Sequence, residues 1–145
     1  SKPGNDSVNL VAKTDIRLGQ LFADASLQLI ADINIDPSKI VAIGSHGQTI
    51  RHQPPSEENG FSVQIGDPNV IAANTGCAVV ADFRRADLAA GGQGAPLVPA
   101  FHDFLFHSPG KTRIIINIGG IANITILSGD GEKRRSYSLT STSFA

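Results

Sequence analysis

The segment from Ile114 to Leu127, IIINIGGIANITIL, places two glycines and an asparagine between two apolar runs. A Gly-Gly pair between hydrophobic strands predicts a β-hairpin turn. Glycine also lets bare backbone approach a ligand closely, as a phosphate-binding loop requires. The two interpretations are compatible, because the tip of a hairpin can also bind phosphate, and the local sequence leaves both open.

Two further segments carry groups suited to ligand binding. GSHGQT, from Gly44 to Thr49, follows an apolar run, and the ends of strands are where open α/β sheets bind ligands. Its glycines and hydrogen-bonding side chains suit a hydroxyl-rich ligand, although an ordinary turn explains them equally well. DFRRAD concentrates Asp82, Arg84, Arg85 and Asp87, and arginine binds carboxylate or phosphate through two hydrogen bonds. An internal cluster of ion pairs is the alternative interpretation.

Other known site patterns fail. SPGKT lacks the first glycine of a P-loop, because Leu105 stands at that position, and a strand follows it where a helix is needed. GGQGAP does not complete a dinucleotide fingerprint. The four histidines are too far apart for a zinc pattern, so no metal site is predicted. Cys77 opens an apolar strand and is expected to be a small core residue.

The elements that position these segments follow from hydrophobic periodicity. Apolar residues three and four apart predict an amphipathic helix over residues 16–33. Apolar runs predict strands at 39–45, 61–65 and 77–81, with Phe61, Val63 and Ile65 on the core side of the second. Asp67, Pro68 and Gly76 have the spacing of a short helix with both caps. Residues 82–99 are expected to form a long functional loop, before a helix at 99–106 and the paired strands of 113–127. Alternating strands and helices predict an α/β fold.

Composition limits the function further. The chain has 145 residues, 41% hydrophobic content and 17% charge, which is typical of one soluble globular domain. A net charge of −1 predicts no nucleic acid partner and no membrane partner. A single cysteine suits a reducing compartment. The chain has no methionine and starts abruptly, so we expect a piece of a longer protein, with an irregular tail over residues 128–145.

Four stretches together closely resemble the bacterial anhydro-N-acetylmuramic acid kinase family: AIGSHGQTIRH, VQIGDPNVIA, TGCAVVADFRRADLAAGGQGAPLVPAFH and INIGGIANITIL. The resemblance runs from about Val41 to Leu127. It implies part of an actin-like (ribonuclease H-like) ATPase domain with a mixed sheet and flanking helices. Residues 1–127 would be a partial N-terminal kinase domain, followed by the irregular tail.

The family resemblance also implies site residues. Gly119 and Gly120 would present backbone N–H groups to the phosphates of ATP, with Asn123 supporting the loop. Thr49 and Arg85 would contact the sugar, Arg85 through the lactyl carboxylate, with Gln48 and Asp87 completing the sugar site. ATP and Mg²⁺ are the expected cofactors. Small-molecule sugar and ATP are the expected partners in the cytoplasm, and association as a homodimer is left open.

The chain departs from the family pattern at both ends. The family's first phosphate loop, Gly-Thr-Ser-Leu-Asp-Gly, is absent. SYSLTSTSFA stands where the family has an Asp-Cys/Thr-Gly-Pro-Gly-Asn motif with the general base. No catalytic residue is therefore assigned. The resemblance implies a kinase that opens 1,6-anhydro-N-acetylmuramic acid and phosphorylates it to N-acetylmuramic acid 6-phosphate in cell-wall recycling, with this chain an inactive fragment. The alternatives are a non-catalytic sugar-binding or interaction module and a proteolytic product.

Overall fold

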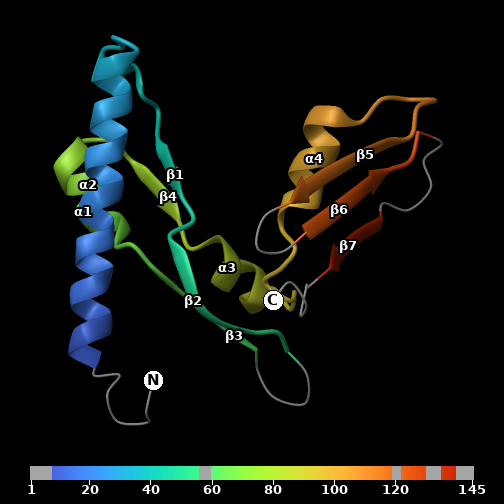
Figure 1. Cartoon of the computed structure of the whole chain (residues 1–145), viewed down its shortest axis with the longest axis horizontal. Helices are drawn as coiled ribbons and strands as arrows, with labels where there is room; N and C mark the ends of the chain where they lie inside the picture. The colour runs from blue at the N-terminus through green and yellow to red at the C-terminus, as the bar shows by residue number, and fades with distance from the viewer. Residues whose placement is uncertain (1–7, 56–59, 119–121, 130–134, 140–145) are drawn as a thin grey trace. The chain divides into compact units, whose positions relative to one another are not determined.

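A computed structural model describes residues 8–55, 60–118, 122–129 and 135–139 of the chain (Figure 1). Helices and strands alternate along it, so the predicted α/β class is confirmed. The chain divides into two compact units, Ser1–Gly94 and Ala95–Ala145. This division falls inside the region that the sequence analysis assigns to one domain, and the domain boundary expected at residue 127 remains a prediction.

The described residues of unit 1 form four short strands, three α-helices and a short 3-10 helix, η1 (Pro37–Lys39). The helices are α1 (Val8–Asp32), α2 (Pro68–Thr75) and α3 (Phe83–Ala89), and the strands are β1 (Ile43–Ser45), β2 (Gln48–Gln53), β3 (Phe61–Ile65) and β4 (Val79–Ala81). β1 pairs with β4 in parallel, with Gly44 opposite Val80. β2 and β3 form an antiparallel ribbon whose register shifts between Thr49 and Arg51. The sequence analysis did not predict β2 or α3, which both lie in segments expected to be loops or binding sites. The loop prediction for residues 82–99 is wrong over α3.

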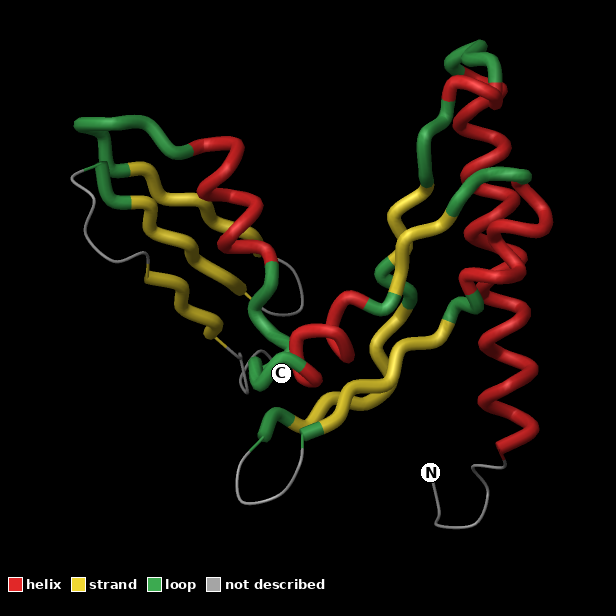
Figure 2. The backbone as a smooth tube through the Cα atoms, turned by 180° about the vertical axis from the view of Figure 1, so that it is seen from behind, coloured by secondary structure: helices red, strands yellow, loops and turns green. Residues whose placement is uncertain are grey.

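α1 packs along α2, as Figures 1 and 2 show. The helix begins at Val8, earlier than its predicted start, and its buried residues are Gly19, Ala23 and Ile30. Most of the large apolar residues of the predicted face stay exposed, Leu29 at 59% among them. The close helix contact therefore runs along small residues beside that face, where the backbones of α1 and α2 can approach each other.

The predicted caps of α2 are confirmed. The Asp67 side chain accepts a hydrogen bond from the Asn69 N–H at 2.8 Å, and Pro68 occupies the first turn. Gly76 ends the helix in the left-handed conformation with φ 70°, which glycine adopts without steric cost. Ile71 in the middle of α2 is fully buried. Cys77, which follows the end of the helix, is also buried, as expected for a core cysteine.

Unit 2 is a helix and a three-stranded antiparallel sheet: α4 (Val98–Phe106), β5 (Arg113–Ile118), β6 (Ala122–Leu127) and β7 (Arg135–Leu139). Ile118 pairs with Ala122, so the predicted hairpin of β5 and β6 is confirmed. The expected irregular tail is wrong for residues 135–139, because β7 pairs with β6 along its whole length. The backbone ladder of β6 orders a polar segment that lacks the apolar pattern of a strand.

Candidate functional site

The structure brings the GSHGQT and DFRRAD segments together in unit 1. His46 follows β1, and its Nε2 accepts a hydrogen bond of 2.8 Å from Nε of Arg84 on α3. Arg84 Nη1 donates to the Gly94 carbonyl oxygen at 2.7 Å. The two predicted segments and the glycine-rich loop after α3 are therefore joined through one guanidinium group, which the sequence analysis did not assign to the site.

Thr49 belongs to a row of polar side chains on the β2–β3 ribbon. Gln64 Nε2 donates to Thr49 Oγ1 at 3.0 Å and to Ser62 Oγ at 2.7 Å. His52 Nδ1 lies 3.1 Å from the same Ser62 oxygen. We call Thr49, His52, Ser62 and Gln64 the polar row. Gln48 lies outside it, exposed at the start of β2, with a long 3.5 Å contact to the Thr49 carbonyl.

The prediction that Phe61, Val63 and Ile65 face the core is confirmed for Ile65, which is buried, and is wrong for Phe61 and Val63. Phe61 and Val63 are 41% and 39% exposed, whereas Ser62 between them is 2% exposed. The polar face is the covered one, because α3 packs against β3. A buried hydroxyl needs a partner, and the Gln64 amide supplies it. The sequence signal was the polar alternation Ser62–Gln64 within FSVQI, which was interpreted as the solvent side of the strand.

A cavity of about 500 Å³ opens between the ribbon and α3. Its lining combines apolar residues and glycines with Ser62 and Arg85, and it comprises Pro55, Gly60, Phe61, Ser62, Arg85, Leu88, Ala89 and Gly91. Volumes of roughly 300–1,000 Å³ are usual for small-molecule sites. Thr49 and Gln48 do not line this cavity. Thr49 is connected to it only through Gln64 and Ser62.

Among the described residues that line this cavity, Arg85 is the charged one. Its Nε donates to both carboxylate oxygens of Asp82 at 2.7 Å, and its Nη2 also pairs with Asp82 Oδ2. This hydrogen bond, and then the charge of Asp82, raises the pKa of Arg85 above its ordinary value. Asp82 itself has φ 62°, a conformation that aspartate tolerates better than most residues. The ion pair expected as the alternative interpretation is thus present, and it leaves the 68% exposed arginine side chain facing solvent.

Asp87 holds the loop that follows α3. Its Oδ2 accepts a hydrogen bond from the Gly94 N–H at 2.7 Å, and its carbonyl accepts one from Gly92 at 2.8 Å. A Cβ atom at Gly92 would lie within 2.6 Å of three carboxylate atoms of Asp87, so a larger residue there would require the Asp87 carboxylate to move. The Asp87 carboxylate therefore shapes the loop, and its assignment to the sugar remains a prediction.

The predicted phosphate-binding residues belong to unit 2. Asn123 lies in β6 opposite Asn117 of β5, one pair before the end of the hairpin. Gly119 and Gly120 lie outside the described residues. Asn123 is partly buried. Its role in supporting a phosphate loop remains a prediction.

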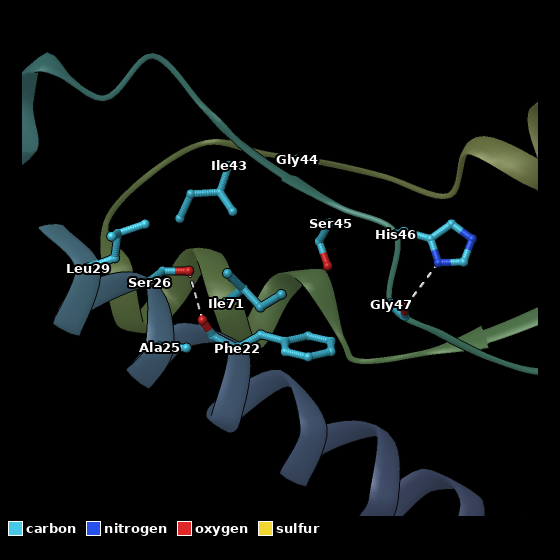
Figure 3. Close-up of a pocket in the computed structure, with 10 residues that line it drawn as sticks. All are labelled: Phe22, Ala25, Ser26, Leu29, Ile43, Gly44, Ser45, His46, Gly47 and Ile71. Atoms are coloured by element: carbon cyan, nitrogen blue, oxygen red, sulfur yellow. Dashed lines mark hydrogen bonds between the residues drawn. The ribbon is translucent and has the colours of Figure 1, made fainter. Parts of the chain in front are cut away.

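A second cavity, of about 370 Å³, lies between α1, α2 and β1 in unit 1 (Figure 3). Its walls include Phe22, Leu29, Ile43 and Ile71, with Leu29 and His46 at opposite ends of the group. The Ser26 hydroxyl is engaged with the Phe22 carbonyl at 2.7 Å. Four residues of the GSHGQT segment also line this cavity: Gly44, Ser45, His46 and Gly47.

Among residues 8–55, 60–118, 122–129 and 135–139, no group of three or more His, Cys, Asp or Glu side chains is placed to hold a metal ion. Within the same ranges, no helix is both long and apolar enough to cross a membrane.

Comparison with known proteins assigns the α/β chain to a class of phosphotransferases. The family model described as anhydro-N-acetylmuramic acid kinase matches residues 1–138. The chain belongs to this family. The match continues past residue 127 to residue 138, and the departure expected after residue 127 stays a prediction.

Full-length relatives agree with this assignment. Proteins named anhydro-N-acetylmuramic acid kinase are 59% identical over 130 residues in Shewanella pealeana and 60% identical over 131 residues in Shewanella amazonensis. Each alignment covers 90% of this chain and 35% of the relative. A third, from Shewanella halifaxensis, is 57% identical over 128 residues, which is 88% of this chain and 34% of the relative. The chain thus spans about a third of the length of the curated relatives that it matches.

Proposed function

We propose that this chain supplies the sugar-binding part of an ATP-dependent kinase. The enzyme would hydrolytically open 1,6-anhydro-N-acetylmuramic acid and phosphorylate it to N-acetylmuramic acid 6-phosphate, in the cytoplasmic recycling of cell-wall sugars. The observation that carries the proposal is the family match over residues 1–138, which includes both candidate segments of unit 1. Sugar, ATP and Mg²⁺ are the small molecules it would use.

The chemistry of unit 1 supports a sugar ligand. A sugar presents several hydroxyl and amide groups. Of the polar row, Ser62 lines the 500 Å³ cavity, and Gln64 and His52 contact its hydroxyl. The lactyl carboxylate of the proposed substrate is an anion, and Arg85 is the cation in the wall of that cavity. A carboxylate bound there would either share the Arg85 guanidinium with Asp82 or take the place of Asp82 as its partner.

The phosphate side of the proposal rests on the hairpin of unit 2. Ile118 pairs with Ala122, so the connection that contains Gly119 and Gly120 is only three residues long. Successive backbone N–H groups in a tight turn are suited to phosphate oxygens. We propose these glycines as phosphate ligands supported by Asn123. Mg²⁺ would be held chiefly by the nucleotide phosphates, as is usual for this ion, and it neutralises charge in phosphoryl transfer. No residue of this chain is proposed as the general base.

Calorimetric titration tests the proposal directly. The 145-residue chain is titrated with 1,6-anhydro-N-acetylmuramic acid and then with ATP-Mg²⁺, beside a full-length Shewanella relative as the positive control. Saturable sugar binding by the chain supports a sugar site in unit 1. Sugar binding without ATP binding, and without phosphorylated product, favours the non-catalytic sugar-binding module. No sugar binding by a folded chain contradicts the proposed role.

Arg85→Ala gives the first mutational prediction. Removing the guanidinium should weaken sugar affinity about tenfold, the low end for a hydrogen-bonded charge pair, because the Arg85 side chain is largely exposed. Affinity for ATP should not change. Arg17→Ala, an exposed arginine on α1, is the matched control. Equal losses of sugar and ATP affinity, or an equal loss in Arg17→Ala, would exclude a carboxylate contact at Arg85.

A further inference from the structure

The hydrogen bonds of His46 define its protonation state. Arg84 Nε–H can only donate, so His46 Nε2, at 2.8 Å from it, must present a lone pair. His46 Nδ1 lies 3.0 Å from the Gly47 carbonyl oxygen, which can only accept, so Nδ1 must carry a hydrogen. Both contacts are satisfied together only by the neutral imidazole with its proton on Nδ1. A proton on Nε2 would place two donors against each other.

Arg84 also binds the loop that follows α3. Its Nη1 donates to the carbonyl of Gly94, whose N–H is bound by Asp87. Gly94 is buried with φ 71°, and a Cβ atom there would lie 3.3 Å from the His52 ring of the polar row. Arg84 therefore links the residue that precedes β2 to the loop that packs against β2.

α3 depends on such side-chain contacts for its position. It has only seven residues, and no side-chain hydrogen bond caps its N-terminus. The helix also carries Arg85 and Leu88, which line the cavity next to Ser62. A displacement of α3 would therefore move the proposed carboxylate ligand relative to Thr49, only three residues after His46.

We infer that Arg84 is a positioning residue of the sugar site and that neutral, Nδ1-protonated His46 holds it in place. The inference rests on the proposed function. It assigns no contact between Arg84 and the sugar. Arg84 acts by fixing the segment Gly44–Thr49 and the loop Gly91–Gly94 against each other through α3.

Nitrogen-15 NMR of the imidazole rings tests the His46 state without any ligand. At a pH above the range in which histidines gain protons, His46 should show its bound hydrogen on Nδ1, and His46→Gln identifies its signals by their loss. Arg84→Met should shift His46 toward a mixture of the two tautomers, because the lone pair at Nε2 is no longer required. An Nε2–H tautomer in the wild-type chain overturns the inference.

Titration with 1,6-anhydro-N-acetylmuramic acid tests the positioning role. His46→Phe keeps the ring but removes the acceptor, and Arg84→Met removes the donor. Each should weaken sugar binding about fivefold, the usual value of one hydrogen bond. The double variant should be no weaker than Arg84→Met alone, because Arg84→Met already removes the contact to His46 as well as the contact to Gly94. His46→Gln retains an acceptor oxygen and should recover most of the affinity. If His46 had only a structural role, no such recovery would be expected.

The outcomes separate the two proposals. A folded wild-type chain that binds no sugar contradicts the proposed function, whatever its imidazole spectrum. Sugar binding that is equally strong in His46→Phe, Arg84→Met and the wild type overturns the positioning role and leaves the proposed function standing. Additive losses in the double variant also overturn it, since independent residues would then be involved.

Discussion

Asp15 connects three parts of unit 1 through one residue on α1. Its Oδ1 accepts a hydrogen bond of 2.6 Å from the Gly66 N–H, and its backbone carbonyl accepts one of 3.2 Å from Asp67. Gly66 is buried with φ 113°, and the Phe22 ring lies 2.9 Å from the position of a Cβ atom there. The carboxylate therefore satisfies a buried donor in a turn that only glycine can form.

Asp15→Ala should lower the free energy of unfolding by about 1–3 kcal/mol, because the Gly66 N–H would be buried without a partner. Asp15→Asn should cost less, since it retains an acceptor oxygen. Urea unfolding followed by circular dichroism measures the change. Asp24→Ala, an exposed aspartate on the same helix, is the control. Equal stability of Asp15→Ala and Asp24→Ala would contradict the role of the carboxylate.

Single residues were predictable where the chain makes its own local contact. The Asp67 cap and the Gly76 terminus of α2 involve neighbours in sequence, and both were identified. Ser62 was misplaced because its burial depends on α3, which lies more than twenty residues further along the chain. Alternation within FSVQI identifies two faces, but it does not say which one another element will cover. Arg84 was named within DFRRAD, but its contact with His46 was not predicted for the same reason, since the two residues are 38 positions apart.

At the scale of elements, Gly19 decides how closely α1 and α2 approach. A Cβ atom at this position would lie 2.8 Å from the carbonyl oxygen of Asp67 and 3.1 Å from Cβ of Val70. Glycine in the middle of a helix costs about 1 kcal/mol relative to alanine. The close contact explains why the helix nevertheless has glycine here, because the nearest atom belongs to the backbone and has no rotamer to escape into.

Gly19→Ala should therefore destabilise unit 1, by roughly 1–3 kcal/mol, despite the gain in helix propensity. Thermal unfolding of the variant shows whether the stability of unit 1 falls or rises relative to the wild type. Gly44→Ala in β1 is the matched control, because nothing lies within 4 Å of its added Cβ atom. It should change stability by no more than about 0.5 kcal/mol. A stabilised Gly19→Ala variant would show that the two helices separate at little cost.

Helices and strands were predicted well where hydrophobic periodicity is strong. They were predicted poorly where glycines and polar residues suggested a loop or a binding site. β3 was placed at its observed bounds, and the pairing of β5 with β6 followed from two apolar runs around glycines. α3 was read as loop because glycines follow it closely, although FRRADLA consists mostly of good helix formers. β2 has only Ile50 as a large apolar residue and is ordered by its ladder to β3. Tertiary pairing, which no local window contains, decided β2, whereas the helix propensity that favours α3 was present in the local sequence.

At the scale of the whole molecule, each unit has a small core of its own. Ile71 is fully buried in unit 1, where Ala23 and Ile30 of α1 are also buried. Leu127 is 1% exposed in unit 2, where the neighbouring Thr125 hydroxyl bonds to His102 Nδ1 at 3.0 Å. Large apolar side chains of α4 and β5 remain exposed, Phe104 at 84% and Ile118 at 79%. Two separate cores predict that a cavity made in one unit does not loosen the other.

Ile71→Ala and Leu127→Ala test this separation as a pair. Each removes a fully buried aliphatic side chain and should cost its own unit about 2–5 kcal/mol, or the whole of that unit's stability where less is available. Amide hydrogen exchange should then show lost protection in α1 and α2 for Ile71→Ala, with β5 and β6 unchanged. Leu127→Ala should give the reverse. Loss of protection in both units from either substitution would mean that the chain opens as one cooperative structure, and that the sugar-site segments and the hairpin depend on each other for their folding.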